Sequence, residues 1–241
     1  MAQSGSEFQN SAANDQIRTC LIGNDQQPLL VVDDFWPEPA QLLRYALKRG
    51  NVAAAAGLYP GLRSPAPTVF GEAVLQQLGG VMQQLFGVSA EQVSQIDSYY
   101  SMVCTPAAQL SPLQAIPHFD RPQPRDLAVI YYLCDEHQGG TSFYRHRRSS
   151  FEAILPERQQ HYQQQLAADF RQFGTPKGYI NGDTPMFQRI ASVPARRNRL
   201  VMYRCSSLHS GDIPANYSYD LNPATGRFTI AAFLTGGEKV T

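Results

Sequence analysis

The sequence predicts an α+β fold in which N-terminal helices cover a jelly-roll core of strands. Apolar residues at helical spacing dominate residues 29–95, whereas short runs of strand-forming residues dominate from residue 96 onward. A segment of helix-forming composition at 151–174 interrupts these strands. We therefore interpret 96–241 as the core, 29–95 as a mostly helical cover and 151–174 as a helical insertion.

Length and charge limit the classes of function. The 241 residues fit a single domain, which we place at 17–241 after a polar, disordered start at 1–16. Twenty basic and twenty acidic residues give a net charge of zero, so we expect no nucleic-acid partner and no membrane partner. The N-terminus lacks the features of a signal peptide, and four scattered cysteines fit a reducing compartment, which predicts a cytoplasmic protein. Nothing in this composition predicts an oligomeric state.

The elements of the first third follow from apolar spacing and from turn residues. Residues 29–32 form a short apolar strand, and Pro39 precedes an amphipathic helix at 40–47. The segment Tyr59-Pro60-Gly61 has the composition of an ordered loop, and helical spacing returns at 71–86. These helices are expected to pack against a sheet.

The rest of the chain is mainly strand. Runs of β-branched, aromatic and aliphatic residues predict strands at 99–103, 127–133, 139–144, 186–190, 199–203 and 227–234. A basic cluster at 145–148 follows the third of these runs, directly before the insertion. Because functional residues often lie on loops held by a rigid scaffold, we expect this cluster and the insertion to border the mouth of the site and to select the substrate.

The pattern His118-Phe119-Asp120 has the spacing of two metal ligands on one strand. Side chains at i and i+2 project from the same face, so an imidazole and a carboxylate can bind one ion. His209 is the best third ligand, because a jelly roll returns distant strands to the same rim. Two histidines and one carboxylate leave open coordination positions, as in non-haem iron(II) oxygenases.

An arginine and a threonine on the last strand can bind an anion. Arg227 and Thr229 share one face by strand alternation. A planar guanidinium can hold the far carboxylate of a dicarboxylate co-substrate in a bidentate contact, and a hydroxyl can add another hydrogen bond.

Five motifs follow one another between about Tyr99 and Leu234: His118-x-Asp120, Tyr131-Tyr132-Leu133, Gly139-Gly140-Thr141-x-Phe143, His209 and Gly226-Arg227-x-Thr229. In these motifs and their order the chain resembles the 2-oxoglutarate and iron(II)-dependent oxygenases, especially the prolyl 4-hydroxylase-like branch. The combination of Tyr59-Pro60-Gly61, the run from Gly139 to His146 and Gly226-Arg227-x-Thr229 also resembles an uncharacterised bacterial subfamily. The resemblance implies a double-stranded β-helix of the cupin-like kind that binds Fe(II) and 2-oxoglutarate. It also implies that Tyr132 hydrogen-bonds 2-oxoglutarate. The chain departs from the family by offering Cys104 or Thr105 where relatives often place a tyrosine.

The implied reaction converts 2-oxoglutarate to succinate and CO2 and hydroxylates a substrate that the sequence does not identify. An amino acid, a protein side chain and a small metabolite all remain open. Two alternatives stand beside this hypothesis: a cupin-like metal-dependent enzyme that does not use 2-oxoglutarate, and a catalytically inactive jelly-roll binding protein.

Overall fold

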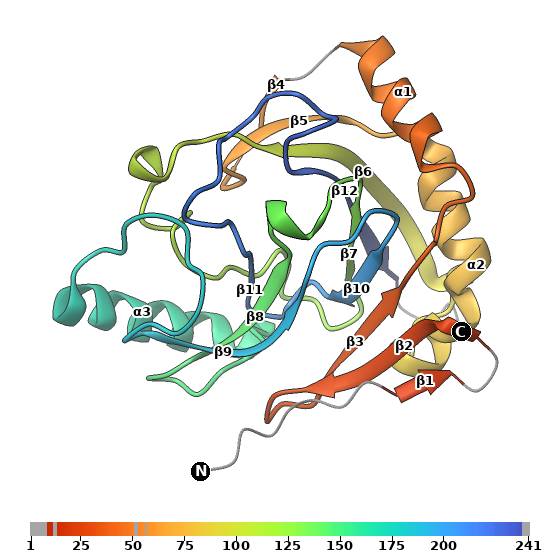
Figure 1. Cartoon of the computed structure of the whole chain (residues 1–241). Helices are drawn as coiled ribbons and strands as arrows, with labels where there is room; N and C mark the ends of the chain where they lie inside the picture. The colour runs from red at the N-terminus through yellow and green to blue at the C-terminus, as the bar shows by residue number, and fades with distance from the viewer. Residues whose placement is uncertain (1–8, 12–13, 51–52, 56, 238–241) are drawn as a thin grey trace.

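Two antiparallel sheets make up the centre of the molecule. The computed structural model describes residues 9–11, 14–50, 53–55 and 57–237. Its large sheet has nine strands in the order β1-β2-β3-β10-β7-β12-β6-β5-β4, and its small sheet has three in the order β11-β8-β9. Figure 1 shows the small sheet facing the concave side of the large one.

The strand bounds follow from the backbone pairing. The large sheet contains β1 (Gln9–Ser11), β2 (Asn14–Ile22), β3 (Gln27–Val32), β4 (Ala53–Ala54), β5 (Gly61–Pro65), β6 (Val93–Val103), β7 (Leu127–Tyr132), β10 (Leu200–Arg204) and β12 (Phe228–Gly236). The small sheet contains β8 (Thr141–His146), β9 (Phe187–Val193) and β11 (His209–Gly211).

Helices α1 (Pro39–Arg49) and α2 (Thr68–Phe86) cover the outer face of the large sheet (Figure 1). Each helix ends where a glycine, Gly50 or Gly87, takes a left-handed conformation that favours this residue. The apolar face of α2 packs with alternate residues of the central strands in one buried cluster. Within the described ranges, every helix is too short or too polar to cross a lipid bilayer.

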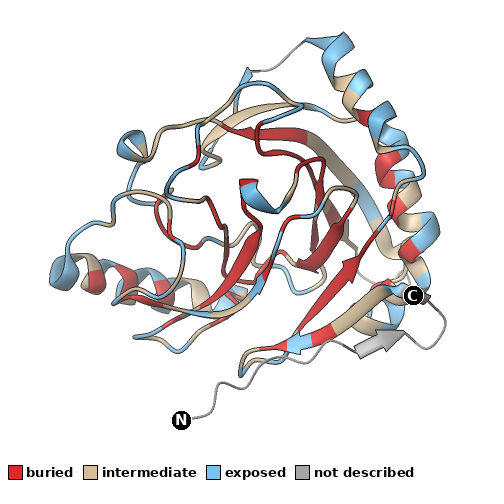
Figure 2. Cartoon of the chain, in the orientation of Figure 1, coloured by how far each residue is buried: buried red, intermediate tan, exposed pale blue. Residues whose placement is uncertain are grey.

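Strand alternation separates this outer cluster from the interior between the sheets. On β12, Phe228 and Ile230 belong to the outer cluster, whereas Thr229 and Ala231 face the interior. A second buried cluster, which includes Tyr132 and Phe143, lies between the two sheets. Figure 2 shows the resulting buried layer along the central strands.

Helix α3 (Gln159–Phe173) packs on the other face of the small sheet. Its residues Tyr162 and Leu166 join Tyr144 of β8 in a third buried cluster. His146 Nε2 lies 2.8 Å from Asp169 Oδ2, and both side chains are buried, so this contact fixes α3 to the end of β8.

The prediction of a disordered start at 1–16 is wrong where the structure describes it. Residues 1–8 and 12–13 lie outside the described residues, but Gln9–Ser11 and Asn14–Ile22 form strands. Their polar composition concealed this, because β2 pairs with the buried strand β3 and β1 pairs with β2, and this pairing decides their conformation more than propensity does. The 29–95 segment likewise holds the strands β4 and β5 in addition to its two helices.

Candidate functional site

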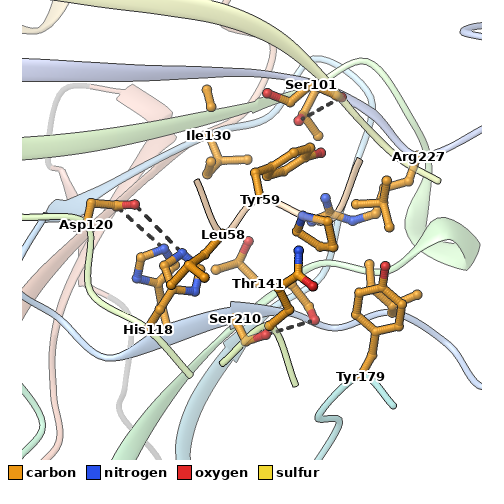
Figure 3. Close-up of a pocket in the computed structure, with 18 of the residues that line it drawn as sticks. Leu58, Tyr59, Ser101, His118, Asp120, Ile130, Thr141, Tyr179, Ser210 and Arg227 are labelled. Carbon is orange, nitrogen blue, oxygen red and sulfur yellow. Dashed lines mark hydrogen bonds and ion pairs between the residues drawn. The ribbon is translucent and has the colours of Figure 1, made fainter. Parts of the chain in front are cut away.

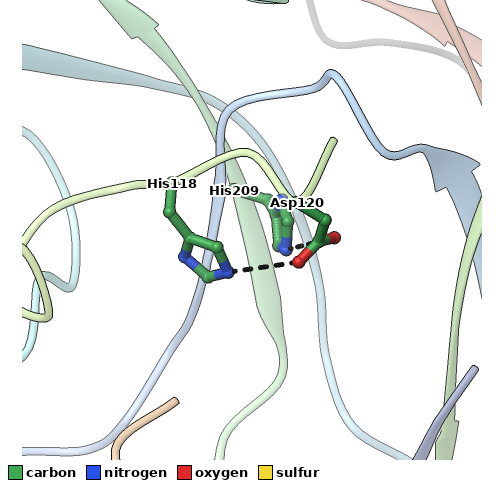
Figure 4. Close-up of side chains that lie close together, drawn as sticks. All are labelled: His118, Asp120 and His209. Atoms are coloured by element: carbon green, nitrogen blue, oxygen red, sulfur yellow. Dashed lines mark ion pairs between the residues drawn. The ribbon is translucent and has the colours of Figure 1, made fainter. Parts of the chain in front are cut away.

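Three predicted ligands meet at one point between the sheets (Figure 4). His118 and His209 form an isolated antiparallel bridge, and the amide of Asp120 donates to the Cys205 carbonyl at 2.8 Å. One ligand atom from each side chain lies within 4.8 Å of the other two. Asp120 places one carboxylate oxygen 3.7 Å from His118 Nε2 and the other 3.6 Å from His209 Nε2.

Hydrogen bonding prepares His209 to bind a metal. Its Nδ1 lies 2.9 Å from the carbonyl oxygen of Ser207, and because a carbonyl can only accept, Nδ1 carries the hydrogen. Nε2 then has a free lone pair that points toward Asp120. His209 is 6% exposed, so its ring is held firmly in this orientation.

The local electrostatics also suit a cation. Burial in the pocket, with the charges of His209 and Arg63, lowers the pKa of His118 well below its usual value, although 44% of its side chain stays accessible to solvent. Burial raises the pKa of Asp120, and neighbouring positive groups only partly offset this. Asp120 Oδ2 is buried without a hydrogen-bond partner in the described structure. A bound divalent ion would supply the missing partner.

The spacing fits one ion with a small inward movement. Ligand atoms at about 2.0–2.2 Å from a metal lie about 2.8–3.1 Å from each other in octahedral geometry and about 3.3–3.6 Å in tetrahedral geometry. The distances of 3.7 and 3.6 Å from Asp120 are close to the tetrahedral spacing and exceed the octahedral spacing by about half an ångström. The donor set of two imidazoles and one carboxylate is that of an iron(II) site with open positions.

The three groups open into a pocket lined by the inner face of the large sheet and by β8 and β11. Cross-strand pairing places Arg63 of β5, Ser101 of β6, Thr229 of β12 and Tyr132 of β7 in one transverse row. The first three of these line the pocket. Figure 3 shows Arg227 across the pocket from His118 and Asp120.

Arg227 is a buried cation without an acidic partner. Its side chain is 5% exposed, and its guanidinium donates to the carbonyls of Gly139 and Gly140 at 3.2 and 2.8 Å. No carboxylate among the described residues pairs with it. A buried charge needs such compensation, so the geometry leaves room for an anionic ligand.

The other two predicted co-substrate residues occupy different positions. Thr229 lines the pocket, and its hydroxyl lies 3.4 Å from the Ser101 carbonyl. Tyr132 is fully buried and is not among the residues that line the pocket; its hydroxyl lies 2.6 Å from Thr141 Oγ1. Thr141 does line the pocket, so Tyr132 is placed to orient the Thr141 hydroxyl.

Two residues were missed as site residues: Tyr59 in the loop before β5, and Arg63 on β5. Tyr59 lines the pocket with a buried hydroxyl that has no partner in the described structure, and burial raises the pKa of this phenol to about 12. Arg63 stacks on the Tyr59 ring at 4.4 Å. The available signal was the Tyr-Pro-Gly sequence: a Cβ on Gly61 would lie 1.9 Å from the Met102 carbonyl oxygen, so glycine allows this turn to approach β6.

The expected role of the 151–174 insertion and the basic cluster at the site mouth is wrong. No residue from 145 to 174 lines the pocket. Each arginine of the cluster instead forms an ion pair: Arg145 with Glu152, Arg147 with Asp183 and Arg148 with Asp169. These acids neutralise the charge of the cluster. After Thr141, the next residue along the chain that lines the pocket is Tyr179, which follows α3.

Comparison with known families gives one assignment. The model of a family described as a family of unknown function (DUF6445) matches residues 13–234, which is most of the chain. The chain belongs to this family. No curated protein matches it.

Several solved structures are similar in part to this DUF6445 protein. HygX from Streptomyces hygroscopicus, solved with nickel and 2-oxoglutarate, has 15% identity over 90% of this chain and 85% of its own, with a TM-score of 0.49. EvdO2 from Micromonospora carbonacea var. aurantiaca has 11% identity, coverage of 88% and 87%, and a TM-score of 0.48. A Pseudomonas putida prolyl-4-hydroxylase has 13% identity, coverage of 89% and 95%, and a TM-score of 0.47. Likeness at this level assigns no activity.

Proposed function

We propose that this DUF6445 protein is a non-haem iron(II) and 2-oxoglutarate-dependent oxygenase with a double-stranded β-helix core, and that it hydroxylates its substrate. His118, Asp120 and His209 would hold the metal, since their donor atoms fit one divalent ion. When bound, iron(II) and 2-oxoglutarate supply the oxidising chemistry, with succinate and CO2 as the co-products. The chain contributes binding, orientation and exclusion of water.

The observation that carries this proposal is the position of Arg227. A buried guanidinium without an acidic partner shares one pocket with an open-sided set of metal ligands. A dicarboxylic keto acid can bind at both of these groups. Its keto-acid end can chelate the metal, and its far carboxylate can pair with the Arg227 guanidinium.

Hydroxyl groups along the pocket complete the binding site in this proposal. Thr229 and Thr141 offer side-chain hydroxyls, and Tyr132 holds the latter in place at 2.6 Å. The unpartnered Tyr59 hydroxyl supplies a phenol from the loop before β5. The resemblance to the oxygenases placed the corresponding tyrosine at Cys104 or Thr105, just after β6. The hydroxyls of Thr229, Thr141 and Tyr59 would hold the co-substrate in the pocket, and Tyr132 would act through Thr141.

Binding and turnover test the proposal separately. Calorimetry should detect 2-oxoglutarate binding to protein loaded with nickel, and succinate should form with iron(II), oxygen and an active compound from a substrate library. Metal binding without 2-oxoglutarate binding would favour a cupin-like enzyme of another kind. Binding of both, with no succinate from any compound, would favour an inactive binding protein.

A further inference from the structure

A second unpaired guanidinium faces the same pocket. Arg63 of β5 is partly buried, and its Nε donates to the Ser101 hydroxyl at 3.2 Å. Its guanidinium carbon lies 4.4 Å from the ring centre of Tyr59, 5.6 Å from that of Tyr99 and 5.8 Å from that of Phe233. No carboxylate of the described residues pairs with it, so its terminal nitrogens remain available to a ligand.

A neighbouring arginine shows that this arrangement is specific to the pocket. Arg121 approaches the same Phe233 ring, at 5.7 Å, but it also pairs with Asp97 and Asp126 at 3.3 and 3.6 Å. Arg121 does not line the pocket, whereas Arg63 does. Both arginines lie beside the Phe233 ring, but only Arg63, which lines the pocket, has no acidic partner among the described residues.

Charge balance indicates what Arg63 binds. Among the described residues that line the pocket, Asp120 is the only acid, and Arg63 and Arg227 are the only arginines. A divalent metal, Asp120, Arg227 and dianionic 2-oxoglutarate together are neutral. Arg63 therefore keeps one uncompensated positive charge in the loaded site, which a monovalent anion would neutralise.

The mouth of the pocket is apolar next to this charge. Leu58 and Leu113 line it and are 49% and 44% exposed, and Phe233 and Ile130 line its wall. Exposed leucines at a pocket entrance favour a ligand that covers them. The anion bound at Arg63 is thus expected to carry an apolar portion.

We propose that the substrate is a small organic carboxylate with an alkyl or aryl portion, and that Arg63 binds its carboxylate. This inference rests on the proposed function for its reaction, but its binding step does not require turnover. A planar guanidinium binds a carboxylate through two parallel hydrogen bonds, and the aromatic rings around Arg63 hold the guanidinium in one plane.

The test compares matched ligands by calorimetry on protein loaded with nickel and 2-oxoglutarate. Benzoate, phenylacetate, 3-phenylpropionate, hexanoate and octanoate are each compared with their primary amides, which keep the shape and lose the charge. At least one carboxylate should bind about 10- to 100-fold more tightly than its amide. Equal binding of acids and amides, or no binding of any acid, would overturn the proposal.

Variants of Arg63 test whether this residue binds the carboxylate. Arg63→Gln should abolish the preference for carboxylates, Arg63→Lys should restore part of it, and Arg147→Gln, at a residue that does not line the pocket, should leave it unchanged. An Arg63→Gln protein that keeps the full preference would contradict the proposal, as would one that loses 2-oxoglutarate binding instead. If the wild-type protein fails to bind 2-oxoglutarate, the proposed function fails, and the same ligands measured with nickel alone still test Arg63.

Discussion

His118 and His209 exchange both of their backbone hydrogen bonds, with nitrogen to oxygen distances of 2.9 and 2.8 Å. The backbone therefore brings the two imidazoles together, with ring centres 4.4 Å apart. Asp120 is tied by its own amide to Cys205. Because the fold alone brings the three side chains together, the candidate metal site is preorganised.

Asp120→Asn should weaken binding of nickel or iron(II) by more than about 100-fold, because the carboxylate is the only anionic ligand. The unfolding temperature of the metal-free protein should stay the same or rise, since the variant removes a buried charge whose Oδ2 has no partner. Calorimetry and thermal unfolding measure the two effects. His161→Ala, an exposed histidine on α3, is the matched control and should change neither.

Arg227→Ala should weaken 2-oxoglutarate binding by about 30- to 150-fold, which corresponds to about 2–3 kcal/mol for a charge-assisted bidentate contact. Nickel affinity should remain within about twofold of the wild-type value, and Arg227→Lys should recover part of the loss. Unchanged co-substrate affinity in the alanine variant would refute the assignment of this residue.

Tyr59→Phe separates binding from stability. The Tyr59 hydroxyl has no partner in the described structure, so its removal should not destabilise the protein, while 2-oxoglutarate binding should weaken by about 2- to 10-fold. Tyr100→Phe is the contrasting control, because that buried hydroxyl donates to the Leu42 carbonyl at 2.7 Å. The control should lose about 1 kcal/mol of unfolding free energy and keep its affinity.

Asp33 should make stability depend on acid pH. Burial raises the pKa of this carboxyl, but the hydrogen bonds and charge of Arg199, with the charges of Arg18 and Arg196, outweigh burial and leave the pKa below its usual value. A lowered pKa stabilises the fold above the unfolded value of about 3.9, and the benefit is lost as pH falls through the folded pKa. Asp33→Asn should therefore cost about 3 kcal/mol at pH 7 and much less at pH 2 to 3, as measured by urea unfolding. An equal cost at both pH values would contradict this.

The sequence predicted those parts of the fold that local pattern determines. Alternation and apolar runs located β7, β10 and β12 to within one or two residues at each end. The order of motifs correctly predicted that His118, Asp120 and His209 lie close together. Strands β2 and β5 were not predicted, because their residues are polar or rich in turn formers. They form strands only because they pair with neighbouring strands.

The chemistry of the pocket depends on register, which a single sequence does not contain. Arg63 faces the site because β5 pairs with β6 so that Arg63 lies opposite Ser101, and a shift by one residue would turn it outward. The role of the basic cluster was wrongly predicted because its acidic partners lie 7 to 36 residues away in the chain. The sequence alone does not show that these acids neutralise its charge.

Strand β12 lies between β6 and β7 at the centre of the large sheet, although it follows every other described strand in the sequence. Because the ribosome synthesises the chain from the N-terminus, β6 and β7 each have an unpaired edge until β12 has been synthesised and pairs with both. A nascent or truncated chain that stops before residue 227 can carry all three metal ligands but lacks both Arg227 and the strand that closes the sheet. Such fragments would expose two aggregation-prone edges, and for this protein translation must pass β12 before either the fold or the pocket is complete.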